Sequence, residues 1–181
     1  MENNPQNIKV KIGIKEDFEK LTKLYYTNTI NKMFHVEYEN YQIKLSEVDL
    51  EKPIHNSNSY VEEISEVMIP KLSEKNIIPL VVFVDDQPAG YMINEWQFWP
   101  QGKIMINHGI LVANKYTRQG LAKKLVEKSI KIAKADTECN GIHIEMCTFK
   151  YQANKLLLSM DFVFAGTKFF IWHNSLPYKN S

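Results

Sequence analysis

The chain has 181 residues, of which 44% are hydrophobic and 24% charged, and its formal net charge is +1 at pH 7. The length and composition indicate one ordinary globular domain, and the near-neutral net charge argues against nucleic-acid binding. The chain has two cysteines, which are too few for a disulfide framework or a metal cluster. No apolar run reaches the ~20 residues of a membrane span, and the polar first residues contain no signal-peptide core. We therefore expect a cytoplasmic protein without a membrane partner, a nucleic-acid partner or a metal.

The N-terminal part of the chain gives a mixed pattern. Residues 8–14 alternate apolar and polar, which predicts a half-buried strand, and residues 17–26 have the spacing of an amphipathic helix. Residues 28–58 show no clear period, and Pro53 indicates a loop. Residues 60–72 again have helical spacing.

The C-terminal part is easier to interpret. Residues 79–84 and 88–96 have the composition of two buried strands joined by a turn, which predicts a hairpin. The further expected elements are a strand over 104–112, a helix over 120–135, a strand over 141–146, a helix over 151–160 and two short strands over 162–164 and 168–172. This order predicts an α/β domain of the α+β type with a mixed sheet.

Charge is unevenly distributed along the chain. Residues 37–66 hold eight acidic and two basic residues, whereas residues 115–134 hold seven basic residues and one acidic residue. One interpretation is two solvated surfaces. The other is a cationic end for an anionic cofactor and an acidic wall for a cationic substrate.

Residues 109–126 predict an anion-binding site. They have the pattern of a buried strand, a polar turn and a helix start, with Gly120 and Ala122 as small residues and Lys123 directly after them. Glycine allows unusual backbone angles, and a helix start offers unpaired N–H groups and a partial positive charge. Together these features suit a pyrophosphate. Tight packing between helix and strand is the alternative.

The same stretch resembles the signature R/Q-x-x-G-x-G/A of the GNAT superfamily of acetyl-CoA-dependent N-acetyltransferases. Gly120 and Ala122 occupy its two small positions, whereas Thr117 stands at the first position and Arg118 one place later. The closing pattern of the family falls on residues 153–162. From the fourth strand onward, the spacing is similar to that of streptothricin-type acetyltransferases.

The resemblance implies a single GNAT-like domain over residues 1–181. Its sheet would be mixed and mostly antiparallel, splayed at the fourth and fifth strands, with helices on both faces. Residues 1–78 would form a variable part that shapes the acceptor site, and residues 79–174 the acetyl-CoA-binding core. Dimers are common in this family, so a homodimer stays open.

The resemblance also implies the cofactor contacts. Leu111 and Val112 would bind the pantetheine arm through the main chain, as an added strand. Asn154 lies on the helix expected over residues 151–160 and could contact the cofactor. The pyrophosphate would lie against Thr117, Arg118, Gln119, Gly120, Leu121, Ala122 and Lys123.

Two residues are the main candidates for the catalytic base. The family often has a glutamate on the fourth strand, and the matching position here is His108. A neutral imidazole can accept a proton at physiological pH, although a lone histidine in a strand is more often structural. Glu95 is the second candidate and Glu145 a third. The usual tyrosine proton donor is replaced by Leu157.

The sequence therefore predicts an acyltransferase that moves an acetyl group from acetyl-CoA to a primary amine of a small, cationic molecule by direct attack in a ternary complex. The aromatic residues Trp96, Phe98 and Trp99 either pack in the core and loops or line the acceptor pocket. The alternative function is a GNAT-fold protein that binds CoA or regulates without efficient turnover.

Overall fold

The computed structural model describes residues 6–24, 29–39, 42–55, 64–100, 102–145, 151–165 and 169–173. The elements are β1 (Ile8–Ile12), α1 (Lys15–Leu24), β2 (Thr29–Glu39), β3 (Gln42–His55), η2 (Ile64–Met68), η3 (Ile69–Lys71), β4 (Ile77–Val84), β5 (Gln87–Trp99), β6 (Gly102–Val112), η4 (Asn114–Tyr116), α3 (Leu121–Ala135), β7 (Cys139–Glu145), α4 (Tyr151–Leu158), β8 (Val163–Phe164) and β9 (Phe169–His173). The helical turns η2, η3 and η4 are short π- or 3₁₀-helical segments.

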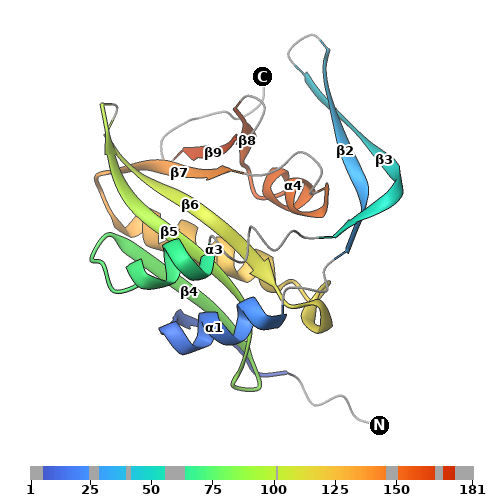
Figure 1. Cartoon of the computed structure of the whole chain (residues 1–181). Helices are drawn as coiled ribbons and strands as arrows, with labels where there is room; N and C mark the ends of the chain where they lie inside the picture. The colour runs from blue at the N-terminus through green and yellow to red at the C-terminus, as the bar shows by residue number, and fades with distance from the viewer. Residues whose placement is uncertain are drawn as a thin grey trace.

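A seven-stranded sheet in the order β1-β4-β5-β6-β7-β9-β8 forms the centre of the structure (Figure 1). All neighbours pair antiparallel except β6 and β7, which are parallel. These two are the fourth and fifth strands of the sheet in chain order. Their register ends at Asn107 and Ile144, whereas β6 continues to Val112 paired with β5, and no other described strand pairs with it there. The expected splay between the fourth and fifth strands is therefore confirmed.

Helices cover both faces of the sheet, as expected (Figure 1). On one face, α3 and α4 bury side chains such as Leu125 and Leu157 against Met92. On the other face, α1 buries Phe18 and Leu21 together with residues of η2, η3 and the strands. Successive residues of a strand point to opposite faces, so β5 and β6 each contribute to both cores.

The N-terminal expectations need two corrections. Residues 29–55, which show no clear period in the sequence, contain β2 and β3, which pair as a separate two-stranded sheet. Pro53, interpreted as a loop residue, lies in β3 between Asp49 and Ile54, where the pairing with β2 shifts, and proline within sheets is found at such irregularities. The helix expected over 60–72 is described only from residue 64, as η2 and η3, and residues 56–63 lie outside the described part.

The β2–β3 hairpin lies beside α4 rather than in the large sheet (Figure 1). Its Glu47 carboxylate lies 2.9 Å from Nζ of Lys32 on the paired strand. Hydrogen bonds from Tyr151 of α4 and from Lys32 hold the pKa of Glu47 below its usual range. The hairpin is therefore attached to α4 by a polar contact.

Candidate active site

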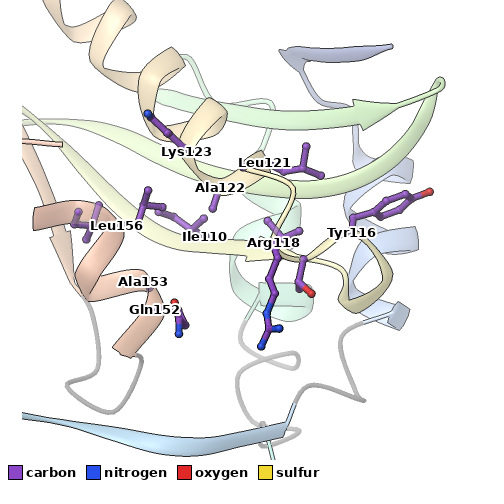
Figure 2. Close-up of a pocket in the computed structure, with 13 residues that line it drawn as sticks. Ile110, Tyr116, Arg118, Leu121, Ala122, Lys123, Gln152, Ala153 and Leu156 are labelled. Atoms are coloured by element: carbon purple, nitrogen blue, oxygen red, sulfur yellow. The ribbon is translucent and has the colours of Figure 1, made fainter. Parts of the chain in front are cut away.

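A cavity of about 320 Å³ lies where the end of β6, the turn before α3 and the helix α4 meet (Figure 2). It is lined by Ile110, Val112, Tyr116, Thr117, Arg118, Gly120, Leu121, Ala122, Lys123, Gln152, Ala153, Leu156 and Leu157. One wall is apolar, from β6 and α4. The other is the start of α3 with two cationic side chains. Such a cavity suits an elongated ligand with an apolar arm and an anionic end.

The turn before α3 is built for close approach of a ligand. Gly120 is the N-cap residue of α3, with φ of 75°, and Arg118 before it also has a positive φ of 61°. A Cβ atom added to Gly120 would meet no heavy atom within 4 Å. Glycine is thus favoured here by its backbone angle and not by tight packing, which removes the packing alternative for this residue.

The first turn of α3 supplies hydrogen-bond donors. Within the helix, Lys124 N–H donates to the carbonyl of Gly120 at 3.1 Å, so the N–H groups before it have no partner of the usual i−4 type. No side chain caps this end and no acidic residue lies in the first turn. The partial positive charge of the helix end therefore adds to that of Arg118 and Lys123.

Seven of the ten residues expected to bind the cofactor line the cavity. The other three do not. Leu111 points to the opposite core beside α1, and its expected role, through the main chain on the unpaired edge of β6, stays a prediction. Gln119 donates to the carbonyl of Lys115 at 3.3 Å, and Asn154 is buried within α4.

Part of the apolar wall was not predicted from the sequence. Ile110 could have been predicted, because it lies two residues before Val112 on the same strand and therefore faces the same side. On α4 the cavity is lined by Gln152, Ala153 and Leu156 beside Leu157, a helix face shifted from the one that carries Asn154. Leu157 has no proton to donate, as the sequence indicated.

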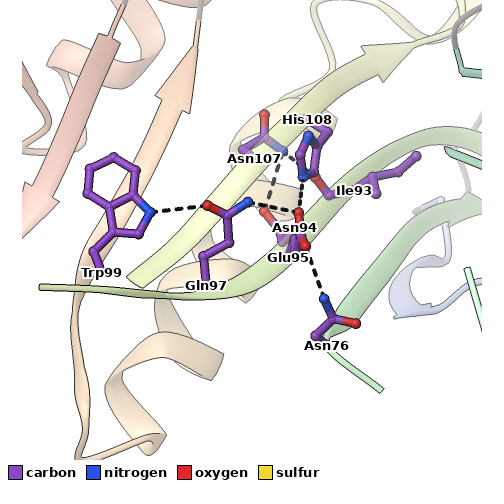
Figure 3. A network of polar contacts seen from close by, with 8 residues as sticks. All are labelled: Asn76, Ile93, Asn94, Glu95, Gln97, Trp99, Asn107 and His108. Carbon is purple, nitrogen blue, oxygen red and sulfur yellow. Dashed lines mark hydrogen bonds and ion pairs between the residues drawn. The ribbon is translucent and has the colours of Figure 1, made fainter. Parts of the chain in front are cut away.

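The two candidate bases lie together (Figure 3). The pairing of β5 with β6 shifts between Ile93–Gly109 and Asn94–Asn107, which leaves His108 as one extra residue on β6. Such a bulge redirects side chains. Nε2 of His108 lies 2.7 Å from Oε2 of Glu95. Residues that the sequence offered as alternatives are therefore one pair.

Further polar groups hold Glu95 in place (Figure 3). Asn76 Nδ2 donates to Oε1 of Glu95 at 3.0 Å, and Gln97 Nε2 donates to Oε2 at 3.1 Å. Partial burial raises the pKa of Glu95, but the hydrogen bonds from Gln97 and His108 and the charge of Lys71 outweigh it, so the net pKa is lowered. The carboxylate is thus ionised beside the imidazole at neutral pH.

The pair lies on the face of the sheet opposite α3. Asn94 donates to Ser129 of α3 at 3.0 Å and so points toward that helix, and the next residue, Glu95, points the other way. The side chains of Glu95 and His108 are 22% and 29% exposed, so solvent or a substrate can reach them. Glu145, the third candidate, is exposed on β7.

The aromatic residues at the end of β5 serve different roles. Trp96 packs against the main core, with Nζ of Lys103 4.5 Å from its ring centre. Phe98 is 77% exposed. Trp99 contacts the ring of His143 at 5.0 Å between ring centres, and its Nε1 donates to Gln97 at 3.1 Å. Packing thus accounts for Trp96, whereas Trp99 is linked through Gln97 to the Glu95–His108 pair.

The described residues contain neither a metal-binding cluster nor a membrane-spanning helix. No group of three histidine, cysteine, aspartate or glutamate side chains is placed to hold a metal ion. None of the described helices is long and apolar enough to span a membrane.

The fold, the splayed strands and the cavity at the start of α3 together define an acyl-group transferase. The chain matches the model of the acetyltransferase (GNAT) family over residues 33–162, and it therefore belongs to that family. The resemblance found in the sequence is confirmed. No curated protein sequence matches this chain.

Solved structures of similar fold belong to proteins that are named for different acetyl acceptors. A protein described as a streptothricin acetyltransferase from Bacillus anthracis, solved with acetyl coenzyme A, is 16% identical with a TM-score of 0.73, covering 92% of this chain and 99% of that one. Nourseothricin acetyltransferase is 16% identical with a TM-score of 0.64, covering 91% and 95%. The Escherichia coli ribosomal-protein-S18-alanine N-acetyltransferase is 13% identical with a TM-score of 0.62, covering 97% and 99%. At these identities the likeness concerns the fold alone.

Proposed function

We propose that this protein transfers the acetyl group of acetyl-CoA to a primary amine of a small cationic molecule, by direct attack in a ternary complex. The observation that carries the proposal is the cavity at the start of α3. Its cationic end at Arg118 and Lys123 matches the charge of a diphosphate, and its apolar wall matches a pantetheine arm.

The donor binds along the splay of the sheet. The diphosphate lies at the N–H groups that follow Gly120. The pantetheine arm extends along Leu111 and Val112, where the edge of β6 has no strand partner on β7, and forms main-chain hydrogen bonds as an added strand would. Ile110 and Leu157 provide apolar contact for the arm.

His108 acts as the base. A carboxylate only accepts hydrogen bonds, so the ionised Glu95 fixes the proton of His108 on Nε2 and leaves Nδ1 free to accept one. The amine nitrogen attacks the thioester carbonyl carbon, its proton passes to Nδ1, and the C–S bond breaks. Solvent protonates the CoA thiolate, because Leu157 carries no acidic group.

The excess of acidic residues in segment 37–66 and the carboxylate of Glu95 support the choice of a cationic amine. Within that segment, Glu47 and Asp49 of the hairpin are already ion-paired with Lys32. Two structures of similar fold are named for acetylation of streptothricin and nourseothricin, whereas a third is named for a ribosomal protein. We assign residues 1–78, which include the hairpin, to shaping the acceptor site and residues 79–174 to the acetyl-CoA core.

An amine panel tests the proposal. Release of free CoA thiol from acetyl-CoA is measured with polyamines, aminoglycosides and a peptide with an N-terminal alanine. We expect turnover with at least one small cation and none with the peptide. Calorimetric binding of acetyl-CoA without turnover on every amine would favour the alternative, a CoA-binding or regulatory protein.

The pH profile of kcat/KM tests the base. A general base must be unprotonated to act, so the wild-type rate should fall at acidic pH, and His108→Ala should lose that acidic limb. His143→Ala is the matched control, because His143 lies on the neighbouring strand β7 and contacts Trp99. An acidic limb that persists in His108→Ala removes this residue from the mechanism.

A further inference from the structure

The shift in strand pairing beside His108 is held by one buried side chain, that of Asn107 (Figure 3). Its Nδ2 lies 3.0 Å from the carbonyl oxygen of Ile93 on β5 and 3.2 Å from that of Gly109 on β6. Ile93 and Gly109 form the last regular pair before the shift. The amide of Asn107 thus joins the two strands where the ladder is interrupted.

The amide belongs to a buried polar chain that reaches helix α3. Asn107 Nδ2 is 3.4 Å from Oδ1 of Asn94, whose Nδ2 donates to Oγ of Ser129 at 3.0 Å. Ser129 in turn lies 3.2 Å from the sulfur of Met92. Asn94 and Ser129 are fully buried and Asn107 is 2% exposed. A polar group in such a place is costly unless it is hydrogen-bonded.

In the side-chain amide of Asn107, the Nδ2 donor makes hydrogen bonds, whereas the Oδ1 acceptor makes none within the described part of the chain. Oδ1 of Asn107 is buried and accepts no hydrogen bond from the residues that the structure describes. An apolar residue of the same size would avoid that cost and fill the same space. The Nδ2 contacts to the carbonyls of Ile93 and Gly109 are what an apolar residue would lack.

We propose that Asn107 is a positioning residue for His108: its contacts with the carbonyls of Ile93 and Gly109 fix the bulge in which the imidazole meets Glu95. Asn107 faces α3, since its amide contacts Asn94, and Ile110 and Val112 face the same side. Strict alternation would put Asn107 and Ile110 on opposite faces, so the extra residue at the bulge is what leaves His108 on the side of Glu95 between them. The catalytic part of this inference rests on the proposed acetyl transfer, whereas the positioning of the ring does not.

Two variants separate positioning from packing. Asn107→Leu keeps the size and removes the donors, and Asn107→Ser keeps one hydroxyl donor and provides a second measurement if the leucine variant does not fold. Ser129→Ala is the matched control, since it removes a buried hydrogen bond of the same chain but leaves the two carbonyl contacts of Asn107 intact.

The first readout is NMR of the His108 ring nitrogens, assigned with His108→Ala, which requires no substrate. We expect the signals of the hydrogen-bonded Nε2 in the wild type and in Ser129→Ala, and a shift toward a free imidazole in the Asn107 variants. Unchanged His108 signals in a folded Asn107 variant overturn the proposal. This readout stands even if no amine is acetylated.

The second readout is steady-state kinetics with the best amine of the panel. The Asn107 variants should lose on the order of 10- to 100-fold in kcat, as expected for a displaced catalytic group, while KM for acetyl-CoA changes less than about twofold. Ser129→Ala should lose thermal stability without this loss in kcat. An equal loss of kcat in Ser129→Ala overturns the proposal, because disturbance of the core would then explain both.

Discussion

Substitution of Gly120 tests the donor site most directly, because this residue combines a left-handed backbone with open space above it. Gly120 has φ of 75°, and an added Cβ atom meets nothing within 4 Å. Gly120→Ala should therefore cost only backbone strain, about 1–2 kcal/mol of unfolding free energy. For a chain of this size that corresponds to a fall in Tm of roughly 2–8 °C. Affinity for acetyl-CoA should change little.

Gly120→Glu causes the same backbone strain as Gly120→Ala and also adds a negative charge. A carboxylate about 5 Å from a diphosphate with about two negative charges costs roughly 2 kcal/mol, at a dielectric constant between that of a protein surface and that of water. The Kd for acetyl-CoA should rise about 30-fold relative to Gly120→Ala. Isothermal titration calorimetry at low salt measures this difference.

Gln119→Glu is the matched control for the charge. It also adds one negative charge, but the side chain of Gln119 turns to the carbonyl of Lys115 and does not line the cavity. Its effect on Kd should be several-fold smaller. Equal affinity of Gly120→Glu and Gly120→Ala, or equal loss in Gln119→Glu, would refute the assignment of the diphosphate to this turn.

Three further results are expected. Asp86 has φ of 59° in the turn between β4 and β5, so Asp86→Gly should relieve about 1 kcal/mol of strain, lose less from the exposed ion pair with Lys9, and raise Tm by a few degrees in a melting experiment. The lowered pKa of Glu95 means that its contribution to stability is present above the ordinary glutamate pKa and is lost as the pH falls through the lowered pKa of the folded state. Glu95→Gln should therefore flatten the acid side of the curve of unfolding free energy against pH, and an unchanged slope would contradict the pairing. Ala153→Trp should fill the cavity and raise the Kd for acetyl-CoA about tenfold or more. Lys155→Trp should not, because Lys155 lies on the same helix but does not line the cavity.

The C-terminal half was predictable because its local signals agree with its tertiary structure. The hairpin β4–β5 turns at Asp85 and Asp86, both with positive φ, and polar turn residues between apolar runs mark it in the sequence. The helix α3 begins at the expected glycine and buries Leu121, Leu125 and Val126 at helical spacing. Each element there packs on the large sheet, so each carries an apolar face.

The hairpin β2–β3 was not predictable by the same reasoning. In the described part of the chain its two strands pair with each other and not with the large sheet, so packing on that sheet does not impose an alternation of apolar and polar residues. Charged pairs such as Glu37 with Lys44 lie directly across it. A proline at a register shift then adds a signal that favours a loop.

The pairing of His108 with Glu95 was also beyond the sequence. Both residues were recognised as candidate bases, but the strand period places His108 on one face when counted from Asn107 and on the other when counted back from Ile110. The bulge decides between the two, and a bulge depends on the register of two strands 13 residues apart in sequence at this point. Asn107, which holds the bulge, looks from the sequence like an ordinary polar residue.

The early end of the pairing between β6 and β7 places an open strand edge inside a sheet instead of at its rim. Unpaired edges at a rim are templates on which another chain can add a strand and begin aggregation. Here the edge of β6 from His108 to Val112 is bounded by β7 on one side and by α3 and α4 above it. An edge enclosed in this way offers another chain less room to add a strand than an edge at the rim of a sheet does.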